Sequence, residues 1–241
     1  MDKVVIFDIY GDFGHFRKFY TTASPLTYAS PPPTTVRGII SAILGFDKNN
    51  YIQKANNLDV AVKILNPVRK IRLGLNYVST KASPLTINFK GIKERTQVFA
   101  EFLKEPRYRI FVKPRNEEGR DILETLNSLL AEGKTNYTVS LGLAYLLANV
   151  KYVGKGEVEN IVTSKRVDTV FSSDIIENID VKGDKKIVKE RMLLYMDDDR
   201  IPGEYVDVIA EITGKSIDGS FKNVCIVSYG AEKDNVFFFN S

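Results

Sequence analysis

The stretch GHFRKFYTTASPLTYASPPPTTVRGIISAILGF, residues 14–46, decides how the N-terminal half of the chain folds. Its last part repeats apolar side chains every three or four residues, the spacing of one helical face, and predicts a helix over about 34–44. Thr34 or Thr35 can cap the start of this helix. The apolar run KVVIFDIYG (3–11) before the stretch predicts a buried strand. The chain therefore begins with a strand, a long loop and a helix.

The rest of the chain predicts further strands and one more helix. Strand patterns fall at 59–65, 71–78, 97–103, 107–112 and 146–154, and a helical pattern falls at 117–133. When a basic segment at about 68–106 is set aside, the order is β-α-β-β-α-β, which is that of the ferredoxin-like or RNA-recognition fold. After about residue 158 the chain contains short β-rich runs separated by Asp/Gly turns. We therefore expect an α+β protein with a ferredoxin-like core over 1–155 and a β-rich lobe over 156–241 packed on it.

Charge is distributed unevenly along the chain. Residues 1–114 contain 18 Lys and Arg against 8 Asp and Glu, whereas residues 115–241 contain 16 against 22. The segment 63–113 alone contains 12 basic and 3 acidic residues. A basic half joined to an acidic half is expected where one face of a protein meets a polyanion. A solvated basic surface has the same composition, so charge alone leaves both interpretations open.

The composition excludes several kinds of site. A single cysteine, Cys225, excludes an internal disulfide and a cysteine-based zinc cluster, and a single histidine, His15, excludes two-histidine metal motifs. The aspartates at 197–199 predict a solvated hairpin tip rather than a magnesium site, because neighbouring side chains on a strand point to opposite faces. The sequence contains no run of about 18 apolar residues and no signal-peptide pattern. We expect a cytoplasmic protein with no metal, cofactor or membrane partner.

The opening stretch has the composition of a site for single-stranded RNA. Its aromatic residues alternate with cationic ones, and proteins hold such RNA with cations on the phosphates and planar side chains under the bases. Thr34 and Thr35 head a helix whose free N–H groups and positive dipole end favour a phosphate. Three prolines at 31–33 stiffen the approach. In the alternative interpretation, the aromatics belong to the core and the prolines simply lead into the helix.

His15 raises the alternative of catalysis. RNA cleavage without a metal needs a general base and a cation near the phosphate, and His15 is the only side chain with an ordinary pKa near neutrality. Arg17 and Lys18 are close by in the sequence. A lone histidine in a loop is more often a packing or hydrogen-bonding residue. An endoribonuclease is therefore the second hypothesis, and a protein-interaction scaffold without RNA is the third.

Several motifs resemble those of the CRISPR-associated protein 5 family, a subunit of the Cascade surveillance complexes of type I systems. YGDFGHFR and YTTASPLTY lead into PPPTTVRGIISAILG (31–45), which is the most specific of them, and RTQVFAEFLKEPRYRIFV (95–112) and YTVSLGLAYLLA (137–148) follow in the expected order. The resemblance implies a ferredoxin-like core with a thumb inserted between its second and third strands, in agreement with the basic segment at 68–106. The YTTxSP form of the second motif looks most like the subtype I-B branch.

The resemblance also implies a function, that of capping the 5′ handle of the guide RNA. The thumb would contact the neighbouring backbone subunit, and the large subunit would dock nearby. One branch of the family is a guide-processing ribonuclease that uses a tyrosine, a lysine and a histidine. This chain has no Lys-His neighbour pair, so we expect it to belong to the non-catalytic branch.

The residues that we expect to bind RNA come from the motifs and from the basic segment. By motif position, the resemblance implies that a loop of Ser140, Leu141 and Gly142 lies near the handle. It places at the handle itself Arg17, Thr34, Thr35, Arg37 and Gly38. The full set is His15, Arg17, Lys18, Tyr20, Tyr28, Thr34, Thr35, Arg37, Gly38, Arg69, Lys70, Arg72, Arg95, Ser140 and Gly142.

Overall fold

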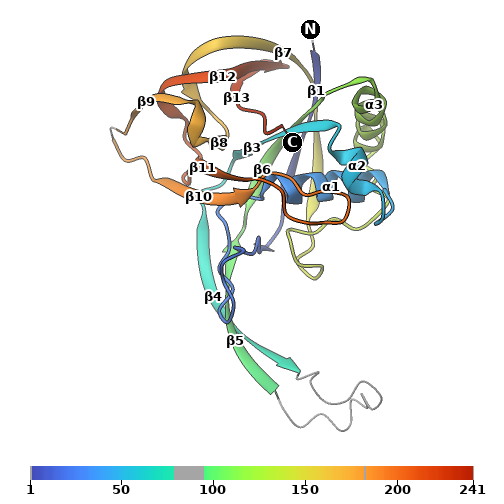
Figure 1. Ribbon diagram of the computed structural model, residues 1–241, viewed down its shortest axis with the longest axis vertical. Coiled ribbons are helices and arrows are strands. Elements are labelled where there is room, and N and C mark those ends of the chain that lie inside the picture. The colour runs from blue at the N-terminus through green and yellow to red at the C-terminus, as the bar shows by residue number, and fades with distance from the viewer. Residues whose placement is uncertain (1, 79–94, 182, 241) are drawn as a thin grey trace.

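A seven-stranded antiparallel sheet joins the two halves of the chain (Figure 1). The computed structural model describes residues 2–78, 95–181 and 183–240. The strand order is β13-β12-β7-β1-β6-β3, and β9 pairs with β12 beside this path. The strands are β1 (Asp2–Tyr10), β3 (Leu58–Ile64), β6 (Arg107–Pro114), β7 (Asn149–Val167), β9 (Ile176–Asp180), β12 (Ile217–Tyr229) and β13 (Glu232–Val236).

Both faces of this sheet are covered, which explains the unbroken apolar run of β1. Alternate side chains of a strand point to opposite faces. Phe7 and its neighbours two residues away belong to the core under the helices, whereas Ile6 belongs to a second core on the other face. Helices α1 (Pro33–Leu44) and α3 (Glu117–Ala131) cover the first face. Side chains of β12, β13 and the segment after them fill the second.

The two expected helices form close to the expected residues, but α1 starts differently from the expectation. Its first residue is Pro33, the residue before it is Pro32, and no side chain caps it. Thr34 and Thr35 therefore lie inside the first turn and do not cap the helix. Proline is well placed at this position because it has no N–H group to satisfy there. The first turn of α1 also contains no acidic residue.

Two small sheets complete the structure. One consists of β10 (Ile187–Leu193), β11 (Tyr205–Glu211) and β8 (Phe171–Ser172), next to a short 3₁₀ turn, η2 (Ser173–Ile175). The other consists of β2 (Phe13–Gly14), β5 (Arg95–Lys104) and β4 (Arg69–Val78). Figure 1 shows the β4/β5 hairpin extending away from the rest of the molecule. Residues 79–94 of the expected insert lie outside the described residues.

The structure confirms an α+β, β-rich and mostly antiparallel fold, and it differs from the expectation in detail. Helix α2 (Tyr51–Ala55) and strand β9 were not expected. Strand β13 ends at Val236, and Phe239 then forms an isolated bridge with Val60 of β3, the strand at the other end of the sheet. Strand β7 continues through residue 155, where we expected the core to end. In the described part of the chain, no helix is long and apolar enough to cross a membrane.

Candidate nucleic-acid interface

The first turns of α1 and the loop at 138–142 form the walls of an open cavity of about 320 Å³, which we call the α1 cavity. The two segments are far apart in the sequence, and both were expected to bind RNA. The predicted residues that line it are Thr34, Thr35, Gly38, Ser140 and Gly142. The structure thus brings together five of the predicted residues.

Backbone hydrogen bonds hold the 138–142 loop against α1 and β2. The N–H group of Tyr137 donates to the carbonyl of Ala42 in α1 at 3.0 Å, and that of His15 donates to the carbonyl of Leu141 at 2.9 Å. Gly142 has a φ of +100°, and a Cβ there would lie 1.9 Å from the His15 carbonyl oxygen. Only glycine allows the loop to approach β2 this closely. The loop wall of the α1 cavity is therefore fixed by the chain around it.

Gly38 forms part of the helix wall and has no structural reason to be glycine. It lies in the middle of α1, it does not have a positive φ, and a Cβ there would meet none of the described residues within 4 Å. Glycine inside a helix costs about 0.5–1 kcal/mol relative to alanine. The absence of a side chain leaves the helix backbone open to the cavity. Glycine is the usual choice where a backbone must come close to a ligand.

The α1 cavity has polar chemistry suited to a phosphate and a sugar. Five of the residues that line the cavity carry a hydroxyl group: Thr34, Thr35, Tyr51, Thr138 and Ser140. The uncapped start of α1, with no acidic residue in its first turn, adds partly positive N–H groups. Hydroxyls donate and accept, so they can serve both phosphate oxygens and ribose hydroxyls.

The sequence did not single out Tyr51, Thr138 or Met196, which also line the α1 cavity. Thr138 lies inside the motif YTVSLG, so the resemblance contained a signal for it. Met196 comes from the segment after β10. The three aspartates that follow it predicted a solvated turn there, and Met196 was therefore not expected at a binding site. Those aspartates are exposed in a turn, as expected, and the Ile201 N–H group donates to the Asp197 carboxylate at 2.7 Å.

Arg37 does not lie at the surface, and this corrects its expected position. Its side chain turns away from the α1 cavity, and the residue is 3% exposed. The guanidinium donates to the backbone carbonyls of Leu58, Leu194 and Phe239 at 3.3, 2.9 and 3.3 Å. Burial lowers the pKa of Arg37 to about 10, although nearby Asp59 opposes the shift. Its position supports a structural role rather than direct contact with RNA.

His15 and Tyr28 are also buried. The His15 ring lies beside the Phe102 ring, and Nδ1 is 2.7 Å from the Glu101 carbonyl oxygen. The Tyr28 hydroxyl donates to the Arg191 carbonyl at 2.6 Å, and burial raises the pKa of Tyr28 to about 12. Both side chains hold the loop at 15–30 against neighbouring strands, which corrects the expectation that they face a ligand.

The same loop exposes Arg17 and Tyr20. The Arg17 guanidinium donates to the backbone carbonyls of Thr21 and Thr22 in its own loop, and Tyr20 is 57% exposed. Lys18 is largely covered, and its ammonium forms an ion pair with Glu190 of β10 at 2.6 Å. Arg17 and Tyr20 therefore remain accessible to a ligand, whereas Lys18 helps to anchor the loop.

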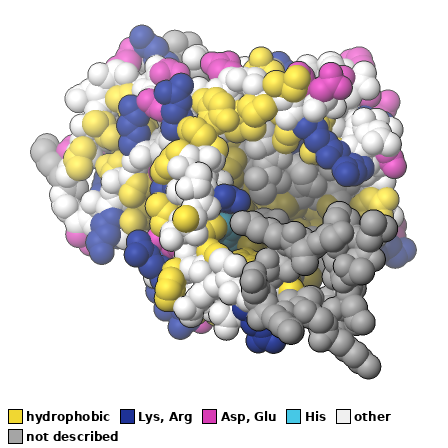
Figure 2. Space-filling model, turned by 60° about the horizontal axis from the view of Figure 1, so that its bottom comes forward, with side chains coloured by type: hydrophobic (Ala, Val, Ile, Leu, Met, Phe, Trp, Pro, Cys, Tyr) yellow, Lys and Arg dark blue, Asp and Glu magenta, His cyan; other side chains and the backbone are white. Residues whose placement is uncertain are grey.

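Some basic residues of the β4/β5 hairpin are also exposed, whereas another bonds to the loop at 15–30. Arg72 and Arg95 are exposed on β4 and β5, and Arg69 is exposed in an ion pair with Glu105. Lys70 is 3.2 Å from the Glu101 carboxylate and donates to the Thr27 carbonyl. Figure 2 shows Lys and Arg side chains spread over the face on the hairpin side, with hydrophobic side chains between them.

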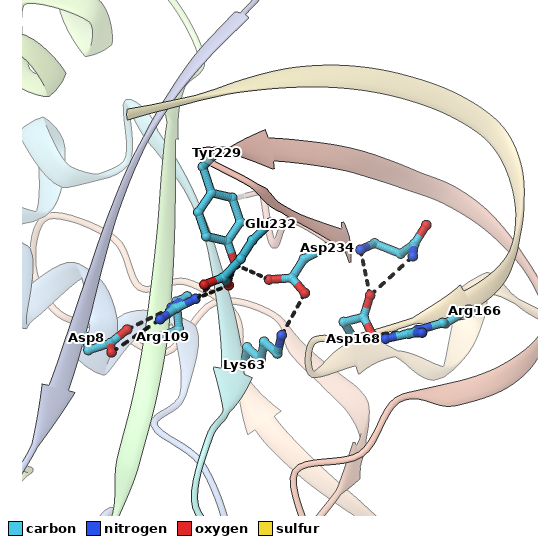
Figure 3. Close-up of polar contacts among 9 residues, drawn as sticks. Asp8, Lys63, Arg109, Arg166, Asp168, Tyr229, Glu232 and Asp234 are labelled. Atoms are coloured by element: carbon cyan, nitrogen blue, oxygen red, sulfur yellow. Dashed lines mark hydrogen bonds and ion pairs between the residues drawn. The ribbon is translucent and has the colours of Figure 1, made fainter. Parts of the chain in front are cut away.

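Four further cations between residues 63 and 113 lie on the sheet face opposite the helices, where carboxylates pair with them. Arg109 bonds to buried Asp8 at 2.8 Å, and Tyr229 links Arg109 to Asp234, which pairs with Lys63 at 2.6 Å (Figure 3). The charge count of this segment therefore overstates the charge that faces solvent. The basic residues on this face are Lys63, Arg107, Arg109 and Lys113.

With this geometry in view, the chain can be compared with known proteins. The family model described as CRISPR-associated protein (Cas_Cas5) matches residues 4–207. The chain belongs to this family. The match confirms the resemblance seen in the motifs, and it includes both walls of the α1 cavity and the whole hairpin.

Two solved structures resemble this Cas5 family member in fold. A CRISPR protein from Archaeoglobus fulgidus superposes with a TM-score of 0.54 at 15% identity, over 98% of this chain and 99% of that one. A chain of a CRISPR RNA-guided surveillance complex superposes with a TM-score of 0.52 at 11% identity, over 87% and 90%. No curated protein matches the chain in sequence. At these identities the likeness concerns the fold.

Proposed function

We propose that this Cas5 family member is an RNA-binding subunit of a CRISPR effector complex, and that the α1 cavity holds the 5′ handle of the guide RNA. The observation that carries the proposal is Gly38, a glycine in mid-helix that lines an open cavity and where an added Cβ would meet none of the described residues within 4 Å. The uncapped start of the same helix and the surrounding hydroxyls supply donors for phosphate and ribose.

The fold supports the finer architecture implied by the resemblance. Strands β7-β1-β6-β3 lie side by side, and the helices follow β1 and β6, which is the order of a ferredoxin-like core. The β4/β5 hairpin is inserted between the second and third core strands, β3 and β6, as the thumb would be. We retain the division into a core over 1–155 and a lobe over 156–241, with the lobe packed on the core.

The proposed partners follow from family membership. The thumb would contact the neighbouring backbone subunit of a Cascade complex, and the large subunit would dock nearby, most closely as in subtype I-B. One of the solved structures of similar fold is described as an RNA-guided surveillance complex. Exposed apolar side chains on the hairpin, Tyr77 at 47% and Phe99 at 57%, offer area for such a contact.

We further propose that the role is non-catalytic. The only histidine is 4% exposed and its ring bonds to a backbone carbonyl, which is the arrangement of a structural residue. A general base must reach the hydroxyl that it deprotonates. Incubation of the purified protein with precursor repeat RNA tests this point. We expect binding without cleavage, and metal-independent cleavage at one position would favour the ribonuclease.

Fluorescence anisotropy with guide RNA labelled at its 3′ end tests the α1 cavity. We expect Gly38→Ala and Thr35→Val each to weaken binding about tenfold, because one fills the space and the other removes a hydroxyl. Thr125→Val on the exposed side of α3 is a matched control that should bind like the parent protein. If neither cavity variant changes the affinity while the parent binds, the handle lies elsewhere.

A further inference from the structure

A second and larger cavity lies between the central sheet and the C-terminal β-lobe. Its volume is about 600 Å³, and the α1 cavity shares none of its lining residues. Sites for small ligands commonly occupy about 300–1,000 Å³ and often lie between lobes. We call it the lobe cavity. It is outside the proposed handle site and needs its own explanation.

At one side of the lobe cavity lies a buried carboxylate, one of whose oxygens accepts no hydrogen bond from the described residues. Asp59 is 7% exposed, and its Oδ1 atom has no hydrogen-bond partner among the described residues. Lys113 and Arg115 form long ion pairs with this carboxylate, with Nζ of Lys113 at 3.5 Å from Oδ2 and Nε of Arg115 at 3.4 Å from Oδ1. Both distances exceed the usual length of a hydrogen bond. A buried acceptor without a donor is costly. A ligand that donates to Asp59 would remove this cost.

The charges around the cavity decide what kind of donor it can be. Lys113 and Arg115 already accompany Asp59, so a cationic ligand would be repelled there. Asp174 and Glu204 also line the cavity, and they disfavour an anionic group beside them. The group that reaches Asp59 should therefore be neutral and should carry N–H donors.

The other walls favour a flat ring. Phe237, Phe238 and Phe239 line the cavity together with the amide side chains of Asn223 and Asn240. Proteins recognise unstacked nucleobases by stacking on aromatic side chains and bonding to the Watson–Crick edge. Guanine carries two adjacent donor groups on that edge, at N1 and N2, which match the two oxygens of a carboxylate. Adenine, cytosine and uracil each carry one.

We propose that the lobe cavity binds a guanine base, with Asp59 accepting from its Watson–Crick edge and the phenylalanines at 237–239 in contact with the ring. The base can belong to a free nucleotide or to single-stranded RNA, since both present the same edge. This site is separate from the handle site, and the proposal does not depend on whether the α1 cavity binds the handle.

Isothermal titration calorimetry on the full chain tests the proposal with GMP, IMP, AMP and CMP. All four carry one phosphate, and IMP differs from GMP only by lacking the amino group at N2. We expect GMP to bind at least tenfold more tightly than IMP, since a hydrogen bond to a charged group is typically worth that factor or more. Asp59→Asn should remove this preference, whereas Asp12→Asn, at an exposed site outside the cavity, should keep it.

Single-stranded RNA containing one guanine, compared with the same RNA containing inosine, distinguishes the two sources. A guanine preference with GMP assigns a free nucleotide, and a preference seen only with RNA assigns a nucleic-acid base; both must depend on Asp59. If Asp59→Asn fails to fold, Phe237→Leu at the half-buried wall replaces it and should weaken guanine binding. The proposal is overturned if neither probe prefers guanine over inosine, or if the preference survives in folded Asp59→Asn protein.

Discussion

Arg17 and Arg37 belong to the same motif stretch, yet their surroundings are opposite. Arg17 is exposed and bonds to carbonyls of its own loop, whereas Arg37 is buried and bonds to carbonyls of three distant segments. Cations beyond the stretch differ in the same way: Arg109 pairs with buried Asp8, and Arg72 lies exposed on the hairpin. Buried cations hold the scaffold together, and exposed cations remain available to a polyanion.

Replacement of Arg37 should have the largest effect on stability. Arg37→Ala removes the donor of three carbonyls, two of them in buried bonds, and we expect the free energy of unfolding to fall by about 3–5 kcal/mol. Urea denaturation measures the change. Arg17→Ala is the exposed counterpart and should change stability by less than about 0.5 kcal/mol. Equal losses of stability in the two variants would contradict the structural role assigned to buried Arg37.

The two glycines of the α1 cavity should respond in opposite directions to alanine. Gly142→Ala forces a side chain onto the His15 carbonyl at a positive φ, so we expect a loss of about 1–3 kcal/mol in unfolding free energy. Gly38→Ala adds a methyl group in open space and should gain up to about 1 kcal/mol from helix propensity. Thermal unfolding of both variants checks this. A destabilised Gly38→Ala protein would mean that the glycine serves the fold.

Salt dependence should separate exposed from buried cations in RNA binding. For single-stranded RNA, the logarithm of the affinity falls with the logarithm of salt concentration by about 0.7 per neutralised phosphate. Arg17→Ala and Arg72→Ala should each reduce this slope by about that amount and weaken binding by about 1 kcal/mol. Arg109→Lys keeps the buried charge and should leave the slope unchanged. A slope that changes as much in Arg109→Lys would contradict the assignment.

Buried Tyr28 extends the comparison to a smaller effect, which depends on pH. The pKa of Tyr28 in the folded protein is about 12 because the phenol is buried, against about 10 for a free tyrosine. The neutral phenol therefore adds stability below pH 10, and this contribution disappears as pH rises through 12. The fall in stability between pH 10 and 12 should be shallower in Tyr28→Phe than in the parent protein. Denaturation curves at several pH values measure this.

Local sequence patterns were sufficient for most of the secondary structure and for part of the site. The apolar spacing of α1 and β1 appears in the sequence because one or both faces of each element are buried. The motifs at 31–45 and 137–148 contained both walls of the α1 cavity. The cavity itself could not be derived, because it depends on how loop 138–142 bonds to α1 and β2.

The environment of each charged residue could not be read from the sequence. Two of the partners of Arg37 lie 157 and 202 residues away, so nothing near Arg37 signals its burial. Arg109 pairs with Asp8 because the register of β1 and β6 places the two residues opposite each other. Lys63 pairs with Asp234 of β13, which is 171 residues away in the sequence. Asp59 likewise looks ordinary in its strand, although it faces the lobe cavity.

Photo-crosslinking of guide RNA that carries 4-thiouridine in its 5′ handle tests the central claim most directly. Peptides joined to the RNA can be identified by mass spectrometry after digestion. We expect crosslinks in residues 34–42 of α1 and in residues 138–142, and we expect Gly38→Ala to reduce them. Crosslinks confined to the sheet face of Arg109, or to the C-terminal β-lobe, would contradict the assignment of the handle to the α1 cavity.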